Sequence, residues 1–334
     1  MTFVSKPLYT SCVTNLILDV DTGEDDALAI LLAANLKLGL KLVVTSYGNS
    51  VVENTTRNTV GVVALTGLKD CPVFKGAPRP SHKHLHFLDS EKEWESAEDF
   101  LGGDGLCGIV LPTPSSVPVI TPPESERVEQ LAELVKRHAP IHYVVTGPCT
   151  NLAELCSYFG SDIGKYITKI SLMGGALNIA GNSGPRDPRN GNQFAEFNFY
   201  CDPYAANEVF KCGVPVYIVA WDTTFRLTIP ISKAMTLKAR DKKTRFIRNL
   251  IIRFFKIYGL KHNREFEFND PAAVWLPLFA PAQFKERRLE AITTANGFGR
   301  LKETSNGSPV FFHSCKNEHI QGIIHELLEA LHLN

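Results

Sequence analysis

Apolar stretches of strand length recur along the chain and are separated by longer stretches with helical periodicity. The predicted strands are residues 16–18, 42–46, 142–145, 170–173 and 216–220, and the predicted helices are residues 27–36, 55–66, 128–137, 152–159, 203–210, 243–258 and 320–331. Strands that alternate with helices are typical of an α/β fold, in which an open, mostly parallel sheet is flanked by helices. Ligands in such folds bind beyond the carboxyl ends of the strands, so we expect the functional residues there.

Two stretches interrupt this alternation. Residues 76–125 and 178–193 are rich in turn-forming residues and are predicted to be long active-site loops, with inert insertions as the alternative. Residues 1–14 precede the first strand as an N-terminal extension. The chain has no internal repeat, and its 334 residues fit one large domain. We therefore expect residues 1–334 to form a single catalytic domain.

The charge balance argues against a polyanionic partner. Lysine plus arginine and aspartate plus glutamate number 35 each, so the net charge is zero, whereas proteins that bind nucleic acid or anionic membranes usually carry a basic surface. A small neutral ligand suits this balance better. The eight cysteines form no CxxC pair, and the chain starts with no signal-peptide pattern and contains no run of eighteen apolar residues. These features predict a cytoplasmic protein with reduced thiols.

One segment carries an unusual density of negative charge. Residues 16–30 read LILDVDTGEDDALAI, with Asp19, Asp21, Glu24, Asp25 and Asp26 directly behind the first strand. Buried carboxylates are costly unless they are paired or bind a metal ion. Capping of the following helix needs one aspartate, so it does not account for this cluster. The spacing also fails the EF-hand pattern, because the required ligand and glycine positions do not match. A divalent-cation site at the sheet rim is the remaining metal-binding interpretation.

Part of the acidic segment also resembles a sequence motif of another protein family. The stretch DVDT, residues 19–22, resembles the nucleophile loop of haloacid-dehalogenase-type phosphatases. Those enzymes also need a late acidic motif, which this chain lacks, and their loop does not require Asp25 or Asp26. A magnesium-dependent phosphatase therefore stays as an alternative.

Several motifs occur in the order that is found in nucleoside hydrolases. These are DVDTGEDDALAI at the first strand, SYGNS after the second, VVTGPCTNLAEL at 144–155, ISLMGGA, FAEFNFYCDPYAA at 194–206 and FNDPAAVWLP at 268–277. From about residue 16 to about residue 331 the chain resembles this family, and the combination is more specific than any single motif. The resemblance implies calcium-dependent hydrolysis of ribonucleosides to ribose and free nucleobase, through an oxocarbenium-like transition state. It also implies a homo-dimer or homo-tetramer.

The resemblance assigns a role to each acidic residue. Calcium would bind the carboxylates of Asp21, Asp26 and Asp270 and the backbone carbonyl of Thr146. Asp21 would also act as the general base that takes a proton from water. Asp19 would support the loop, and we expect Glu24 to face solvent. The ribose hydroxyls would contact Asp25, Asn49, Asn182, Glu196 and Asn198, with Asn192 as the alternative to Asn182.

The group that activates the leaving base is not assigned. Many family members carry histidines where this chain has Leu101 and Asn269, so Asn269 is expected to contact the substrate in another way. The KEW segment resembles one of purine-specific relatives, which makes Trp94 a candidate for base stacking and favours purines slightly. The remaining candidates are Phe266 or Phe268 for a second ring, and His82, His84, His86 or His262 for a proton donor. A calcium-dependent nucleoside- or ribose-binding protein without turnover is the non-enzymatic alternative.

Overall fold

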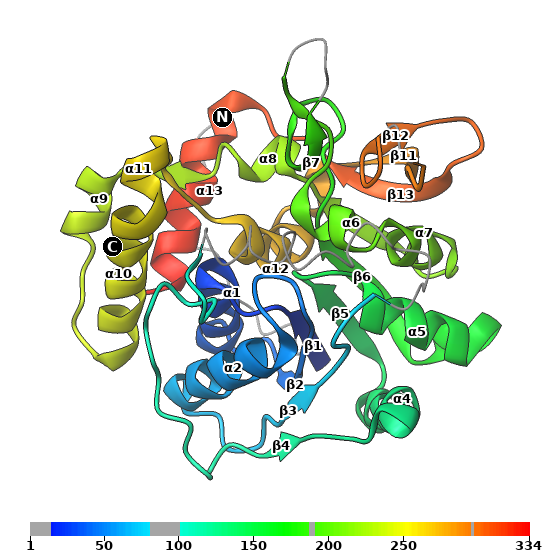
Figure 1. Cartoon of the computed structure of the whole chain (residues 1–334), viewed down its shortest axis with the longest axis horizontal. Coiled ribbons are helices and arrows are strands. Elements are labelled where there is room, and N and C mark those ends of the chain that lie inside the picture. Colours follow the sequence, from blue (N-terminus) through cyan, green and yellow to red (C-terminus); the bar gives the residue numbers. More distant parts are fainter. Residues whose placement is uncertain (1–14, 81–100, 187–190, 295–296) are drawn as a thin grey trace.

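A ten-stranded sheet forms the centre of the computed structural model, which describes residues 15–80, 101–186, 191–294 and 297–334 (Figure 1). The strand order is β12-β11-β13-β8-β6-β5-β1-β2-β3-β4. The strands are β1 (Asn15–Val20), β2 (Leu40–Thr45), β3 (Val73–Lys75), β4 (Val119–Ile120), β5 (Ile141–Val145), β6 (Ile167–Met173), β8 (Val216–Val219), β11 (Phe284–Ala291), β12 (Leu301–Glu303) and β13 (Ser308–His313). Pairing from β4 through to β13 is parallel, and β11 is antiparallel to both of its neighbours.

The direction in which successive strands are added reverses between β1 and β5. From β1 the chain adds β2, β3 and β4 on one side, whereas β5, β6 and β8 follow on the other side. Ligands of open α/β sheets bind at such a switch point, outside the carboxyl ends of the strands. Asp21 directly follows β1 and Thr146 directly follows β5, so both residues lie at this switch point.

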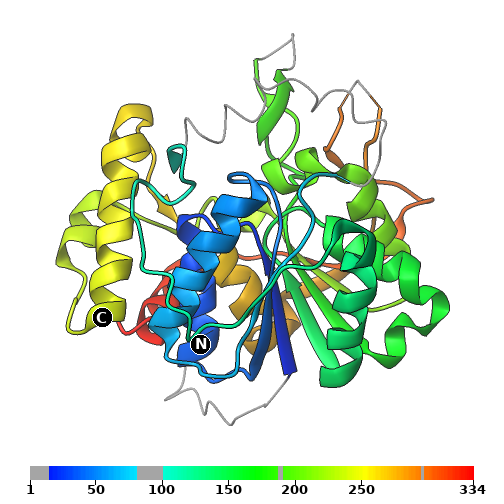
Figure 2. The same cartoon turned by 60° about the horizontal axis from the view of Figure 1, so that its bottom comes forward.

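Helices cover both faces of the sheet, as Figures 1 and 2 show. One hydrophobic cluster joins the sheet to α1 (Glu24–Asn35), α2 (Val52–Thr66), α10 (Lys242–Phe254), α12 (Asn269–Phe279) and α13 (Asn317–Ala330). A second cluster joins the other face to α4 (Arg127–His138), α5 (Thr150–Phe159) and α7 (Pro203–Lys211). The shorter helices are α6 (Phe197–Cys201), α8 (Trp221–Thr224), α9 (Ile231–Thr236) and α11 (Leu260–His262), and β9 (Thr228–Ile229) pairs with β10 (Phe266–Glu267).

The helix α1 is buried along most of its length, which fixes the position of its first turn. Its residues from Ala27 to Ala33 are fully buried between the sheet and neighbouring helices. Each buried leucine or isoleucine stabilises the fold by about 1.5–3 kcal/mol. Gly23 precedes the helix and donates its N–H to the Asp26 carboxylate at 2.9 Å, which caps the first turn. The acidic residues of this turn are thus part of a rigid, packed element.

The predicted α/β fold with its mostly parallel sheet is confirmed, and each predicted strand and helix has a counterpart. Two regions differ from the prediction. Residues 178–193 were expected to be irregular but contain β7 (Gly181–Arg186), which pairs with residues 193 and 195. Residues 76–125 contain β4 at the edge of the sheet. The strands β11, β12 and β13 were missed, and in β11 and β12 exposed charged residues obscure the apolar pattern.

In the part of the chain that the structure describes, no helix combines the length and the apolar character that crossing a membrane requires. The N-terminal extension, residues 1–14, lies outside the described residues.

Candidate active site

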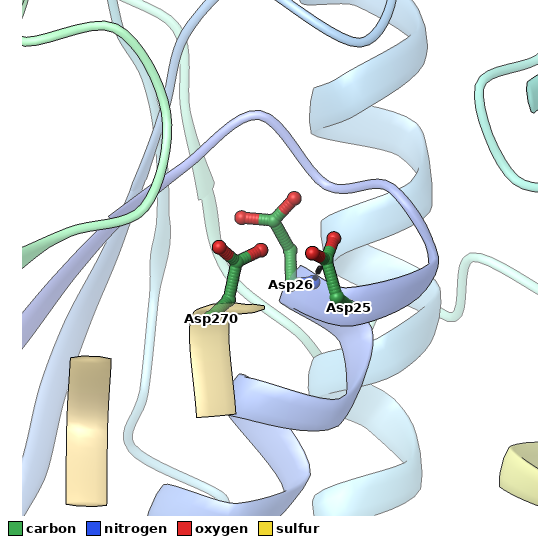
Figure 3. Close-up of side chains that lie close together, drawn as sticks. All are labelled: Asp25, Asp26 and Asp270. Atoms are coloured by element: carbon green, nitrogen blue, oxygen red, sulfur yellow. Dashed lines mark hydrogen bonds between the residues drawn. The ribbon is translucent and has the colours of Figure 1, made fainter. Parts of the chain in front are cut away.

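Three carboxylates converge at the carboxyl edge of the sheet (Figure 3). Asp25 and Asp26 belong to the first turn of α1, and Asp270 belongs to the first turn of α12. One oxygen from each lies within 4.8 Å of the others. Asp26 and Asp270 are 0% and 3% exposed, and Asp25 is 9% exposed. Two helices that are far apart in sequence thus bring together three acidic groups that have little access to water.

Burial raises the pKa of each of these carboxyls, and repulsion from neighbouring carboxylates adds to this shift for Asp26 and Asp270. Desolvation is the largest cause for all three, and the pKa of Asp26 rises to about 6, with repulsion by Asp25 as the next cause. For Asp270, repulsion by Asp25 and Asp26 adds to desolvation. A divalent cation would remove this repulsion, and carboxylate oxygens are ligands that calcium prefers.

Asp21 lies beside this trio and has one unsatisfied oxygen. Its Oδ2 accepts the backbone N–H of Asn49 at 2.8 Å, whereas its Oδ1 is buried and has no hydrogen-bond partner in the part of the chain that the structure describes. A Cβ atom on Gly48 would lie 2.0 Å from Oδ2, and one on Gly147 would lie 2.9 Å from Oδ1. The two glycines therefore give the Asp21 carboxylate its space. Desolvation, followed by repulsion from Asp26, raises the pKa of Asp21 well above its usual value.

Thr146 connects the end of β5 to the acidic trio. Its backbone N–H donates to the carbonyl oxygen of Asp19 at 2.8 Å, and its hydroxyl donates to Asp26 Oδ1 at 2.6 Å. The backbone carbonyl of Thr146, the predicted ligand, accepts the Asn198 side-chain amide at 2.7 Å. A carbonyl oxygen has two lone pairs, so this bond leaves one for a cation. Carboxylates, a carbonyl and an unpartnered buried oxygen together form a donor set that fits calcium.

Glu196 and Asn198 organise the loop that follows β6. Glu196 caps α6 by accepting the N–H groups of Asn198 and Phe199, and its Oε2 accepts the Gly175 N–H at 2.7 Å. Asn198 also donates to the Met173 carbonyl at 3.2 Å. Both side chains are buried at the start of α6. Desolvation raises the pKa of Glu196 to about 7, although three backbone N–H groups oppose this shift.

The asparagines that were predicted to bind the sugar differ in their surroundings. The Asn49 side chain donates to Asp26 at 3.3 Å, which places it at the acidic trio. Asn182 is half-buried in β7, and its backbone N–H donates to Ala195 at 2.9 Å. Asn192, the alternative, is exposed. The pairing of β7 with residue 195 connects Asn182 to the segment that carries Glu196.

Asn269 contacts Asp25 directly. Its side-chain nitrogen donates to Asp25 Oδ2 at 3.0 Å, and its side-chain oxygen is buried without a partner. Leu101, at the other position where relatives carry histidine, is fully buried and packs close to Gly23.

The candidates for base contact are only partly described. Phe266 and Phe268 are fully buried and pack edge to face at 5.5 Å between ring centroids, so they belong to the core. His262 is exposed and stacks on Tyr258 at 4.3 Å between ring centroids. Trp94, His82, His84 and His86 lie outside the described residues.

One expectation about the acidic cluster is wrong, and one residue was overlooked. Glu24 was expected to face solvent but is 6% exposed, with a buried Oε2 that has no partner. Its position in the first turn of a helix that is packed on several sides explains this burial. Ser46, after β2, has a buried hydroxyl without a partner, 3.0 Å from where a Cβ on Gly147 would lie. Ser46 is the first residue of the SYGNS motif, but it was assigned no role. Asp19 accepts bonds from Tyr143 and Asn151 at 3.0 and 2.9 Å, as expected for a supporting residue.

Comparisons with known proteins agree with the site. A family model described as inosine-uridine preferring nucleoside hydrolase matches residues 16–311. A pyrimidine-specific ribonucleoside hydrolase RihA from Photobacterium profundum is 34% identical over 267 residues, which cover 78% of this chain and 79% of the relative. The protein of the same name from Escherichia coli O9:H4 is 33% identical and covers 78% of each chain.

Solved structures give the same result. A purine-preferring ribonucleoside hydrolase from Gardnerella vaginalis superimposes with a TM-score of 0.78 at 25% identity, covering 95% of this chain and 97% of that one. A plant nucleoside hydrolase, PpNRh1, superimposes with a TM-score of 0.75 at 22% identity, covering 95% and 99%, which supports the fold. The resemblance that the motifs predicted is confirmed: the chain belongs to the nucleoside hydrolases, enzymes that cleave the N-glycosidic bond of ribonucleosides.

Proposed function

We propose that this protein is a calcium-dependent ribonucleoside hydrolase that releases ribose and a free nucleobase. The convergence of Asp25, Asp26 and Asp270 within 4.8 Å carries the proposal. Calcium takes six to eight oxygen ligands. The oxygens of Asp21, Asp26 and Asp270 and the Thr146 carbonyl would supply the protein part of that set. The raised pKa of each of these carboxyls supports this assignment, because a cation offsets the repulsion that burial enforces.

Asp21 is the proposed general base. Its Oδ1 has no hydrogen-bond partner among the described residues, so it can accept a proton from a water molecule, while Oδ2 stays bonded to Asn49. A bound calcium ion would supply the positive charge that makes this water more acidic. Cleavage of the glycosidic bond develops positive charge on the sugar, and the surrounding carboxylates would stabilise it.

The sugar hydroxyls are proposed to contact Asp25, Asn49, Asn182, Glu196 and Asn198. Carboxylates and amides suit vicinal hydroxyls, because they offer donors and acceptors in fixed planes. Asn198 would contribute its side-chain oxygen, since its nitrogen donates to the carbonyls of Thr146 and Met173. Glu196 is held by backbone N–H groups, which would give its carboxylate a defined orientation.

The base preference is proposed to include pyrimidines. Two curated relatives that are 33% and 34% identical are named pyrimidine-specific, whereas a structural relative at 25% identity is named purine-preferring. The sequence argument for purines depends on Trp94, which lies outside the described residues. A homo-dimer or homo-tetramer in the cytoplasm remains part of the proposal, and light scattering on the purified protein would test the assembly.

A panel of purine and pyrimidine ribonucleosides tests the proposed function. With calcium present, we expect free base and ribose in equal amounts, and no phosphate from a phosphate ester. Ribose binding without release of base would favour the non-catalytic alternative. Magnesium-dependent phosphate release without base release would favour the phosphatase. The proposed preference is wrong if purine nucleosides alone are cleaved.

A further inference from the structure

Arg264, Glu267 and Asn269 form a chain of polar contacts that ends on Asp25. Arg264 donates from Nη2 to Glu267 Oε1. Asn269 hydrogen-bonds the Glu267 carboxylate, and its side-chain nitrogen donates to Asp25 Oδ2 at 3.0 Å. None of the sequence motifs includes Arg264 or Glu267. The contacts nevertheless connect a half-exposed arginine on the outside of the site to a carboxylate of the acidic trio.

The two carboxylates fix the orientation of the Asn269 amide. An asparagine side chain has two N–H donors on nitrogen and an acceptor oxygen. The nitrogen donates to Asp25 Oδ2. The hydrogen bond from Asn269 opposes the rise that burial causes in the pKa of Glu267, as donation to a carboxylate does, so the nitrogen end of the amide faces both carboxyls. Loss of either carboxylate would free the amide to rotate about its side-chain torsion. Glu267 therefore helps to hold the Asn269 side chain in contact with Asp25.

Arg264 compensates the cost of placing Glu267 there. The Glu267 side chain is 11% exposed, and it is repelled by the charge on Asp25. A buried carboxylate needs a cationic partner, and the Arg264 guanidinium supplies one. This guanidinium also lies 5.5 Å from the ring centroid of Trp221, whose backbone N–H donates to the Gly175 carbonyl at 2.9 Å. The aromatic face adds a favourable contact that restricts the arginine further.

We propose that Glu267 and Arg264 are positioning residues, which hold the Asn269 amide against Asp25 and thereby fix that carboxylate for the sugar. The inference rests on the proposed role of Asp25 in sugar binding. It assigns a function to the segment between α11 and α12, outside the motifs of the family resemblance. It also explains what Asn269 does here: it orients a carboxylate, because its N–H groups are directed at Asp25 and Glu267.

A double-mutant cycle tests this proposal. Glu267→Leu, Asn269→Leu and the double variant are assayed for kcat and KM with a cleaved ribonucleoside at saturating calcium. Each single change is expected to lower kcat/KM by about tenfold, as losses of outer supporting contacts do. The kcat/KM of the double variant should fall no further than that of the more impaired single variant, because Glu267 acts through Asn269. Losses that multiply in the double variant would overturn the proposal.

Further variants separate positioning from simple structural damage. Arg264→Met should lower kcat/KM, and Arg264→Lys should recover part of it, since the charge is retained. Glu265→Leu is the matched control: it removes the same charge two residues away, where Glu265 accepts a bond from Thr228, and it should keep kcat/KM. If the variants of Glu267, Asn269 and Arg264 all lower the thermal unfolding midpoint and kcat/KM in proportion, Glu267 has a structural role alone and the proposal is wrong.

Ribose affinity, measured by titration calorimetry with calcium, distinguishes failure of this inference from failure of the proposed function. A wild type that releases no base from any nucleoside contradicts the proposed hydrolysis. In that case, the ribose affinities of the Glu267→Leu, Asn269→Leu and double variants decide the positioning role. Non-additive losses of affinity support it, and additive losses overturn it. Absence of ribose binding in the wild type would contradict both proposals.

Discussion

The side-chain nitrogen of Asn198 lies 2.7 Å from the backbone oxygen of Thr146, which joins the start of α6 to the loop after β5. Thr146 in turn donates its hydroxyl to Asp26 at 2.6 Å. The segment that is proposed to bind the sugar and the proposed calcium site are therefore linked through one residue. A change at Asn198 should disturb both.

Asn198→Leu tests this link. The change leaves the buried carbonyls of Thr146 and Met173 without their donor, so the free energy of unfolding should fall by about 1–3 kcal/mol. Calcium affinity and kcat/KM should fall as well. Urea unfolding and calcium titration measure these effects. Asn207→Leu is the control, because Asn207 makes two similar bonds to Ala291 at 2.7 and 2.8 Å away from the site. Normal calcium affinity in Asn198→Leu would contradict the link.

Gly48→Ala tests the space around Asp21. A Cβ at this position would lie 2.0 Å from Asp21 Oδ2, and the φ angle of +151° disfavours a side chain. The Asp21 carboxylate must move, so kcat should fall by at least about tenfold, since misplaced catalytic groups are costly. Gly67→Ala is the matched control: φ is +77°, and no atom lies within 4 Å of the added carbon. Strain alone would reduce stability in both variants, whereas equal kcat values would argue against the role of Gly48.

Much of the fold could be predicted from the sequence, because buried parallel strands produce apolar runs. The strand β1 is an example: after its first residue it is fully buried, and the apolar run 16–18 marked it. The strand β11 gave no such signal, because half of its residues face solvent and carry charges. Its position depends on antiparallel pairing with β12 and β13, which follow it in the chain. The pattern of apolar and polar residues within one strand does not predict which strands it pairs with.

The candidate site could be predicted as a set of residues but not as a geometry. The sequence grouped Asp21, Asp26 and Asp270, yet the tightest trio contains Asp25 in place of Asp21. Glu24 was expected in solvent, because periodicity cannot reveal a helix start that is covered on several sides. Glu267 was missed, since its importance arises from two contacts made in three dimensions.

The raised pKa values predict how stability depends on pH in the metal-free protein. Burial raises the pKa of Asp19 and Glu196 to about 7, from ordinary values of 3.8 and 4.5. The folded state therefore binds more protons than the unfolded state between about pH 4 and pH 7, and the free energy of unfolding should fall as pH rises through this range. Thermal unfolding with a chelator, at several pH values, measures this. An unfolding midpoint that rises over the interval would contradict it.

Calcium should oppose this fall in stability as pH rises. The ion binds ionised carboxylates and competes with protons, so its stabilising effect should grow as pH rises. The difference between the unfolding midpoints with calcium and with chelator is the quantity to compare. A difference that is independent of pH would argue that calcium does not bind the buried carboxylates.

The central claim is that Asp21 activates water at a calcium site to cleave ribonucleosides. Release of free base from a ribonucleoside, with calcium and with chelator, tests it most directly in wild type, Asp21→Asn and the surface control Asp162→Asn, whose carboxylate pairs with Lys165. We predict base release that needs calcium in the wild type and the control, and a loss of roughly 10²–10⁴-fold in kcat for Asp21→Asn. Base release that persists with chelator, or at wild-type rate in Asp21→Asn, would contradict the account.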